Sequence, residues 1–295
     1  MSAADNTFSS LSVPARWRRL LRRGARKLLP RPWLTAPGLG AALGLERSHG
    51  HILDRVGGLR VEYSLDSVIG QLLYLRGGFE EAESRFLDER LGRRPGAVLV
   101  DVGANIGLHS LRAARQENVA RVHAFEPGLA TFGILERNIA RNGLGEKIQA
   151  RPVAVGAAAG RAEFHYCADD AYSSLKPDQR RPVQQTYEVT VTTLDEWSLA
   201  EAPSRVDVVK IDVEGSEADV IAGATETLAR FRPELMVEIY QGTRADFFAE
   251  GLVREISGLG YDPFVLIDGK PVPFSRHDDA FFNYHFLPRG GAKLS

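Results

Sequence analysis

The chain has 295 residues, which is enough for one α/β domain with an appendage or for two small domains. Its 44% hydrophobic and 25% charged residues are ordinary for a soluble globular protein, and its single cysteine, Cys167, excludes an intramolecular disulfide and a cysteine-rich zinc site. The formal net charge of −1 conceals an asymmetry, because residues 6–45 carry eight basic side chains and no acidic one. A basic segment therefore precedes an acidic body.

The basic segment is interpreted as a tail covering residues 1–45. Helical periodicity within it places apolar side chains on one face and arginines on the other: Trp17, Leu20, Leu21 and Leu28. Residues 14–31 could therefore contact an anionic membrane surface or nucleic acid, or form a flexible solvated extension ended by Pro30 and Pro32. The tail has no apolar run long enough for a signal peptide or a membrane span. We expect a cytoplasmic protein with peripheral membrane contact as an option.

Residues 46–94 are predicted to form a small N-terminal α/β subdomain. Two short strands flank the turn at Gly57-Gly58, one helix begins near Ser67, and a second runs over about 80–91. A larger domain then covers residues 95–289, followed by a tail at 290–295.

Strands and helices alternate through the larger domain. Strands are predicted at 97–100, 122–125, 147–155, 206–213, 235–239, 261–267 and 280–287, with further extended segments at 161–167 and 187–191. Helices are predicted at 106–116, 129–142, 216–230 and 244–258, and Thr193 to Glu196 has the spacing of a helix capping box. Fully apolar strands alternating with helices indicate a mostly parallel, doubly wound sheet.

The loop after the first of these strands predicts a nucleoside site. Gly103 and Gly107 allow a tight turn, and Glu126 ends the next strand, where a carboxylate can accept the hydroxyls of a ribose. This pattern also fits a nicotinamide-binding unit, although the third glycine of that motif is missing. Asp101 just before the loop suits the ammonium of an amino-acid moiety and would repel a pyrophosphate. The charges therefore favour S-adenosylmethionine.

The strand at 206–213 ends in a second unusual stretch. Alternation would place Lys210, Asp212 and Glu214 on one face of the strand, and Glu238 ends the neighbouring strand. Ionisable side chains at the end of an apolar strand are costly unless they are paired or functional. The stretch is therefore either a transfer site or a buried ion pair.

In these segments the chain resembles the FkbM-type methyltransferases. The matching segments are VLVDVGANIG at 98–107, AFEP at 124–127, AVG at 154–156, SSL at 173–175, VTTLDEW at 191–197, DVVKIDVEGSEADVIAGA at 207–224, RPELMVEI at 232–239 and NYHFLP at 283–288. The resemblance implies a class I methyltransferase fold, with a seven-stranded sheet and an antiparallel last strand. It also implies methyl transfer from S-adenosylmethionine to a hydroxyl of a sugar, glycan or glycosylated secondary metabolite.

The resemblance assigns roles to individual residues. The cofactor would contact residues of three loops: Asp101, Gly103, Ala104, Asn105, Gly107, Glu126, Pro127, Ala154, Val155 and Asp212. Asp212 and Glu214 match the transfer site, with Lys210 beside them. The acceptor would lie near Ser173, Ser174, Glu238 and His109, although the two serines also suit a turn and His109 could serve as an alternative base.

Two chemistries are open at the transfer site. In the first, Asp212 or Glu214 accepts the proton of the acceptor hydroxyl and Lys210 orients that carboxylate. In the second, Asp212, Glu214 and Glu238 bind Mg²⁺ or Ca²⁺, which lowers the pKa of the hydroxyl. Two other functions compete with methyl transfer: a nicotinamide-dependent oxidoreductase, and a non-catalytic cofactor-binding module that docks through the basic tail. Specific nucleic-acid binding is not expected, since the acidic body would repel phosphates.

Overall fold

A computed structural model of the chain describes residues 51–167, 169–176, 182–239, 245–277 and 281–290. The basic tail, including the predicted membrane-contact segment 14–31, lies outside these residues, as does the end of the chain from 291 on. Among the helices of the described part, none is long and apolar enough to cross a membrane. The roles predicted for the tail therefore stay predictions.

The centre of the molecule is an eight-stranded sheet in the order β12-β11-β13-β10-β9-β3-β4-β5. Its strands are β3 (Ala97–Val102), β4 (Val119–Phe125), β5 (Ile148–Arg151), β9 (Val208–Ile211), β10 (Glu234–Glu238), β11 (Tyr261–Ile267), β12 (Lys270–Pro273) and β13 (Asn283–Pro288). Five of them pair in parallel, and β13, the last strand, is antiparallel to β10. Strand order reverses between β3 and β9, which is where a doubly wound sheet binds ligands.

The predicted doubly wound, mostly parallel sheet with an antiparallel last strand is confirmed, but the count of seven strands is wrong. The extra strand, β12, pairs with β11 at the sheet edge. Asp268 and Gly269 join the two strands and both have positive φ, at 52° and 74°. Asp-Gly is the dipeptide preferred in such two-residue hairpin turns, so this signal was present in the sequence.

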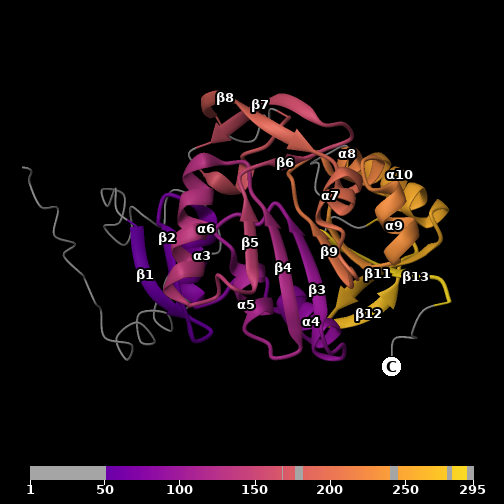
Figure 1. The fold of residues 1–295 in the computed structure, drawn as a ribbon, viewed down its shortest axis with the longest axis horizontal. Helices are drawn as coiled ribbons and strands as arrows, with labels where there is room; N and C mark the ends of the chain where they lie inside the picture. Colours follow the sequence, from indigo (N-terminus) through magenta and orange to yellow (C-terminus); the bar gives the residue numbers. More distant parts are fainter. Residues whose placement is uncertain (1–50, 168, 177–181, 240–244, 278–280, 291–295) are drawn as a thin grey trace, which may run out of the picture.

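Helices cover both faces of the central sheet (Figure 1). The first group comprises α3 (Val68–Arg76), α4 (Glu81–Gly92), α5 (Leu108–Ala114) and α6 (Leu129–Arg141), and it shares a hydrophobic cluster with Leu99 of β3. The second group comprises α7 (Leu194–Glu201), α8 (Glu217–Ala222), α9 (Thr225–Phe231) and α10 (Ala245–Gly258), and it packs with Val100 of the same strand. Neighbouring strand residues face opposite layers because side chains alternate.

The N-terminal hairpin is joined to the larger domain through α6. It consists of β1 (His51–Val56) and β2 (Leu59–Ser64). The Asn138 side chain accepts from the Glu62 N–H at 2.7 Å and donates to the Glu62 carbonyl at 3.0 Å. Burial raises the pKa of the Glu62 carboxyl, but Arg137, His51 and Arg141 outweigh it and lower that pKa to about 2. Buried side chains of this hairpin belong to the same hydrophobic cluster as those of α3–α6.

A second, three-stranded sheet lies above the central sheet in Figure 1. It contains β6 (Ala154–Val155), β8 (Val183–Thr192) and β7 (Gly160–Cys167), with the short helix η2 (Asp170–Tyr172) after β7. The predicted single strand at 147–155 is therefore wrong, since its first half is β5 of the central sheet and its second half is β6. Pro152 separates the halves because it has no N–H for a strand ladder.

The predicted helix at 216–230 is also divided, into α8 and α9. A Cβ added at Gly223, between them, would lie 2.1 Å from the Gly156 carbonyl oxygen. Gly223 is therefore where the chain presses against the loop after β6. The Asp195 carboxylate then accepts the N–H groups of Glu226 and Thr227, at 3.1 and 2.7 Å, and this starts α9. The other predicted helices are confirmed, with α5 shorter than expected.

Candidate active site

A cavity of about 480 Å³ lies at the carboxyl ends of β3, β4, β9 and β10. Most of the predicted site residues line it: Gly103, Asn105, Glu126, Pro127, Ala154, Val155, Ser173, Ser174, Asp212, Glu214 and Glu238. The cavity therefore lies at the reversal of strand order, as predicted. Five predicted residues lie elsewhere, namely Asp101, Ala104, Gly107, His109 and Lys210.

The loop after β3 is shaped by close backbone contact. Gly103 has a φ of 78°, and a Cβ there would lie 1.7 Å from the Asp212 carbonyl oxygen. Gly107 has a φ of 91°, and a Cβ there would lie 2.5 Å from the side chain of Leu135 on α6. Gly107 and the buried Ala104 thus shape the loop and do not line the cavity, and their predicted contact with the cofactor stays a prediction.

Glu126 is held rigidly at the wall of the cavity. One carboxylate oxygen accepts the Asn105 N–H at 2.9 Å and the other accepts the Gly128 N–H at 2.8 Å. These bonds join the two loops that follow β3 and β4. A carboxylate oxygen can accept more than one hydrogen bond, so a carboxylate fixed in this way suits hydroxyl donors of a ligand.

Asp101 does not line the cavity, and its predicted role as a partner for the cofactor ammonium stays a prediction. Its side chain is fully buried and accepts the Ser110 hydroxyl at 2.6 Å. The other oxygen lies 3.8 Å from the ammonium of Lys210, whose strand pairs with that of Asp101. Asp101 therefore holds Lys210 from behind the site.

Lys210 is a buried ammonium directly beneath the cavity. It donates to Asp212 Oδ2 at 3.0 Å and is 3% exposed. Burial lowers the pKa of this amine, but the carboxylates of Asp212, Asp101 and Glu80 outweigh burial and raise it above its usual value. Lys210 therefore stays charged and fixes the orientation of Asp212. This geometry is consistent with both predictions for Lys210. It forms a buried ion pair with Asp212, and it orients the Asp212 carboxylate.

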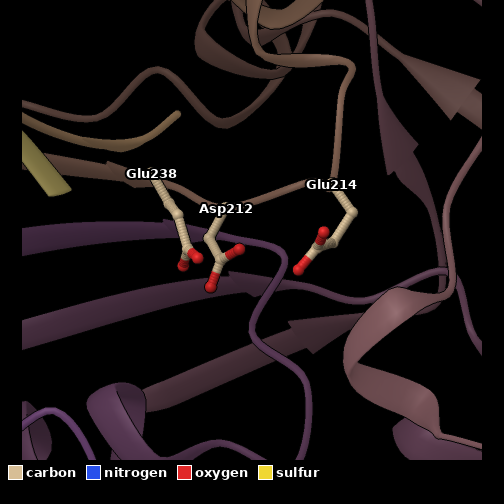
Figure 2. A group of neighbouring side chains, drawn as sticks. All are labelled: Asp212, Glu214 and Glu238. Carbon is tan, nitrogen blue, oxygen red and sulfur yellow. The ribbon is translucent and has the colours of Figure 1, made fainter. Parts of the chain in front are cut away.

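The three predicted carboxylates gather at one point, shown in Figure 2. Asp212, Glu214 and Glu238 each present an oxygen within 4.8 Å of the others. Strand alternation does not explain the position of Glu214, since β9 ends at Ile211 and Glu214 has a φ of 53°. Burial and the charges of Asp212, Glu80 and Glu214 raise the pKa of Glu238 well above its usual value. Glu238 therefore holds a proton more tightly than an ordinary glutamate does.

The N-terminal segment contributes acidic groups that the sequence reasoning missed. Glu80, the N-cap residue of α4, lines the cavity, as does Glu83. His109 hydrogen-bonds the Glu80 carboxylate at 3.0 Å and does not line the cavity, so it acts on the site only through Glu80. Burial raises the pKa of Glu80, but His109, Lys210 and Asn283 outweigh burial and lower it. No pattern in the sequence marks Glu80, because the pairing depends on residues far apart in the chain.

The two predicted serines line the cavity but use their hydroxyls locally. Ser173 accepts the N–H of Cys167 at 3.0 Å, and the Ser174 hydroxyl accepts the Lys176 N–H at 3.1 Å. Both hydroxyls therefore stabilise the turn after β7, which agrees with the prediction that these serines suit a turn. A role in contacting the acceptor stays a prediction.

Glu217, at the start of α8, is a buried acid near the site whose charge should change near neutral pH. Burial raises its pKa from 4.5 to about 7, with a further rise from Asp212, although the Gly215 N–H donates to the carboxylate at 2.9 Å and opposes the shift. Because the folded protein binds this proton more tightly, stability should fall as pH rises from 4.5 to 7.

We therefore expect Glu217→Gln to flatten that slope and to be more stable than the parent protein by about 2 kcal/mol above pH 7. Urea unfolding measured across this pH range provides the test. Glu226→Gln, a matched change at an exposed position of α9, should leave the slope as it is. An equal slope in Glu217→Gln and the parent protein would rule out this assignment.

The cavity suits S-adenosylmethionine in shape and in polar groups. The Ser216 hydroxyl is buried and without a hydrogen-bond partner among the described residues, and Ser216 lines the cavity. Glu126 presents a fixed carboxylate for ribose hydroxyls, and Gly103 leaves backbone exposed at the base of the loop. Val153, Ala154 and Val155 form an apolar wall that suits a base. Glu126 and this apolar wall are what the ribose and the base of an adenosine require.

Comparison with known proteins identifies the family. The model of the methyltransferase FkbM domain matches residues 101–263. "Methyltransferase 1" of Beauveria bassiana is 30% identical over 182 residues, which cover 55% of this chain and 72% of the relative. The "2-O-methyltransferase NoeI" of Sinorhizobium fredii is 28% identical over 47% of this chain and 62% of its own length. The "hexuronic acid methyltransferase AglP" of Haloferax volcanii is 30% identical over 65% of this chain and 75% of its own length. The chain belongs to the FkbM methyltransferase family and is an S-adenosylmethionine-dependent methyltransferase.

Proposed function

We propose that this methyltransferase methylates a hydroxyl oxygen of a sugar, a glycan or a glycosylated metabolite. The observation that carries the proposal is the geometry of Asp212. One of its oxygens is fixed by the Lys210 ammonium at 3.0 Å, and the residue lines the cavity beside the loop of Gly103. A carboxylate positioned in this way can accept the proton of a hydroxyl.

Relatives support oxygen as the acceptor atom. One relative is named a 2-O-methyltransferase and another a 31-O-demethyl-FK506 methyltransferase, while a third is named for a hexuronic acid. Because the chain belongs to this methyltransferase family, the predicted alternative of a nicotinamide-dependent oxidoreductase is wrong. The name of the acceptor is not carried over from any of these relatives, since each match covers only part of this chain.

Each group of the site has a distinct task in the proposed mechanism. When bound, S-adenosylmethionine supplies an electrophilic methyl group, so that the new O–C bond forms as the S–C bond breaks. Glu126 and the loop of Gly103 hold the nucleoside, and Asp212 takes the hydroxyl proton. Lys210 keeps Asp212 aimed at the cavity, and Asp101 keeps Lys210 in place. Alignment of the acceptor in a closed site contributes a large part of the rate.

The divalent-metal alternative stays a prediction. Asp212, Glu214 and Glu238 are close enough to share a cation, but an acidic cluster is common without one. If a cation participates, complete removal by EDTA should abolish methyl transfer, and Mg²⁺ or Ca²⁺ should restore it. If Asp212 is the base, the rate should survive EDTA.

The function is tested with methyl-labelled S-adenosylmethionine and a panel of carbohydrate acceptors. We expect label in the carbohydrate, and linkage analysis by mass spectrometry should place it on oxygen. Label on nitrogen or carbon would contradict the proposal, as would cofactor binding without transfer to any hydroxyl-bearing compound in an extract of the source organism.

A further inference from the structure

Part of the cavity wall comes from residues outside the matched domain, and we take the part beside Asp212 and Glu238 as the acceptor end of the cavity. The domain match covers residues 101–263, yet cavity-lining residues precede and follow it: Phe79, Glu80, Glu83, Phe282 and Asn283. Asn283 lies directly opposite Glu238 in the pairing of β13 with β10. A side-chain hydrogen bond joins Glu80 to Asn283, so Glu80 also lies near the transfer site. These added residues are therefore placed to select the acceptor.

Glu83 differs from the other carboxylates of the site. Glu80 is fixed by the ring of His109, whereas the Glu83 carboxylate has no hydrogen bond or ion pair to any residue of the described ranges. The two lie three positions apart at the start of α4, so they face the same side of the helix. Glu83 is therefore a half-buried acid in a cavity wall, available to a ligand.

Negative charge exceeds positive charge at this end of the cavity. Five carboxyl side chains line it: Glu80, Glu83, Asp212, Glu214 and Glu238. The cation beside them, Lys210, is already engaged by Asp212 and Asp101. Burial raises the pKa of Glu238 well above its usual value, and the charges of Asp212, Glu80 and Glu214 raise it further. An acceptor with a carboxylate or phosphate would therefore be repelled here, and one with a cationic group would be attracted.

Two aromatic residues also line the cavity. Phe79 directly precedes Glu80, Phe282 directly precedes Asn283, and both line the cavity. An aromatic face within about 6 Å of a ligand cation contributes roughly 0.5–2 kcal/mol. Carboxylates near aromatic rings can bind an ammonium group, while the rings pack against the apolar face of the sugar that carries it.

We propose that the acceptor is an amino sugar, whose protonated amine is bound by Glu83 beside Glu80 while a neighbouring hydroxyl faces Asp212. This inference rests on the proposed transfer to a carbohydrate hydroxyl and specifies the class of carbohydrate. It assigns substrate selection to the segment that precedes the family domain. An acidic sugar, the kind of acceptor named for one relative, is rejected by this site.

The test measures binding of three methyl glycosides to the full-length protein loaded with S-adenosylhomocysteine. The probes are methyl glucosaminide with a free amine, methyl glucoside and methyl glucuronide, titrated by calorimetry in a slightly acidic low-salt buffer with EDTA. We expect the amine to bind about tenfold more tightly than the neutral glycoside, and the uronide most weakly. Added salt should reduce the preference.

Variants at position 83 identify the residue responsible. Glu83→Gln should lower the preference for the amine to below about threefold, and Glu83→Lys should reverse it in favour of the uronide. Glu89→Gln is the matched control, since Glu89 lies on the same helix in an exposed pair with Arg93. Affinity for S-adenosylhomocysteine should be equal in all variants, which shows that they are folded.

Several results would overturn the inference: no measurable binding of the amine probe, equal binding of the three probes, or a preference that survives Glu83→Gln. A switch to the uronide on addition of Mg²⁺ would also overturn it, because a bound cation would then set the charge of the site. Failure of the proposed function looks different. In that case the protein would transfer no methyl group to any carbohydrate, whereas methylation of the uronide alone would overturn only the choice of amino sugar.

Discussion

Asp212→Asn should lower the kcat of methyl transfer by about 10²–10⁴-fold while S-adenosylmethionine binds with similar affinity. An amide cannot accept the hydroxyl proton, but it keeps the size of the side chain and can still accept a hydrogen bond from Lys210. Lys210 also keeps Asp101, at 3.8 Å, as a second carboxylate partner. The measurement is the single-turnover rate with labelled cofactor, together with cofactor affinity by calorimetry.

Two further variants make this result specific. Asp219→Asn is the same change on α8, where Asp219 pairs with Lys176 at 2.6 Å and its side chain is 42% exposed, and it should leave the rate unchanged. Asp212→Glu restores a carboxylate and should recover part of the rate. If Asp212→Asn retained full activity, Glu214 would become the candidate base. If Asp212→Ala retained both cofactor binding and cellular function, the protein would act as a non-catalytic cofactor-binding module.

Gly103→Ala should destabilise the protein by about 3–5 kcal/mol, the largest stability effect expected of a single methyl group in this chain. The left-handed φ of 78° would be strained for alanine, and the added Cβ would lie 1.7 Å from the Asp212 carbonyl oxygen. This oxygen belongs to backbone, which cannot rotate away as a side chain can. The loop after β3 and the loop after β9 would have to separate, so cofactor affinity should fall as well.

Gly143→Ala is the control variant, because it introduces the strain of a left-handed backbone without a steric clash. Gly143 has a φ of 66°, but a Cβ there would meet nothing within 4 Å. This variant should therefore cost only about 1–2 kcal/mol, the strain of a left-handed alanine. Urea unfolding of both variants measures the difference. Equal destabilisation would mean that contact between the two loops contributes nothing to stability.

The sequence predicted much of the fold because local signals were strong. Apolar strands, helix spacing and the cap at Thr193, which accepts the Glu196 N–H at 2.9 Å, all lie within short segments. The same holds for the loop at Gly103 and for Glu126, since both directly follow strands in the family motifs. Errors arose where a short segment is compatible with two structures. Pro152 divides a predicted strand and Gly223 a predicted helix, and each break depends on what lies opposite.

The sequence by itself determined the family and the class of cofactor and predicted most of the residues that line the cavity, since motif letters and strand ends are local properties. Only the tertiary structure decided which of these residues face the cavity. Asp101 faces Lys210 because β3 pairs with β9, and His109 faces Glu80 because α5 lies against the start of α4. Glu83 and Asn283 both line the cavity, although 200 positions of sequence separate them. Contacts between residues so distant in sequence follow from packing of whole elements, and no local pattern records them.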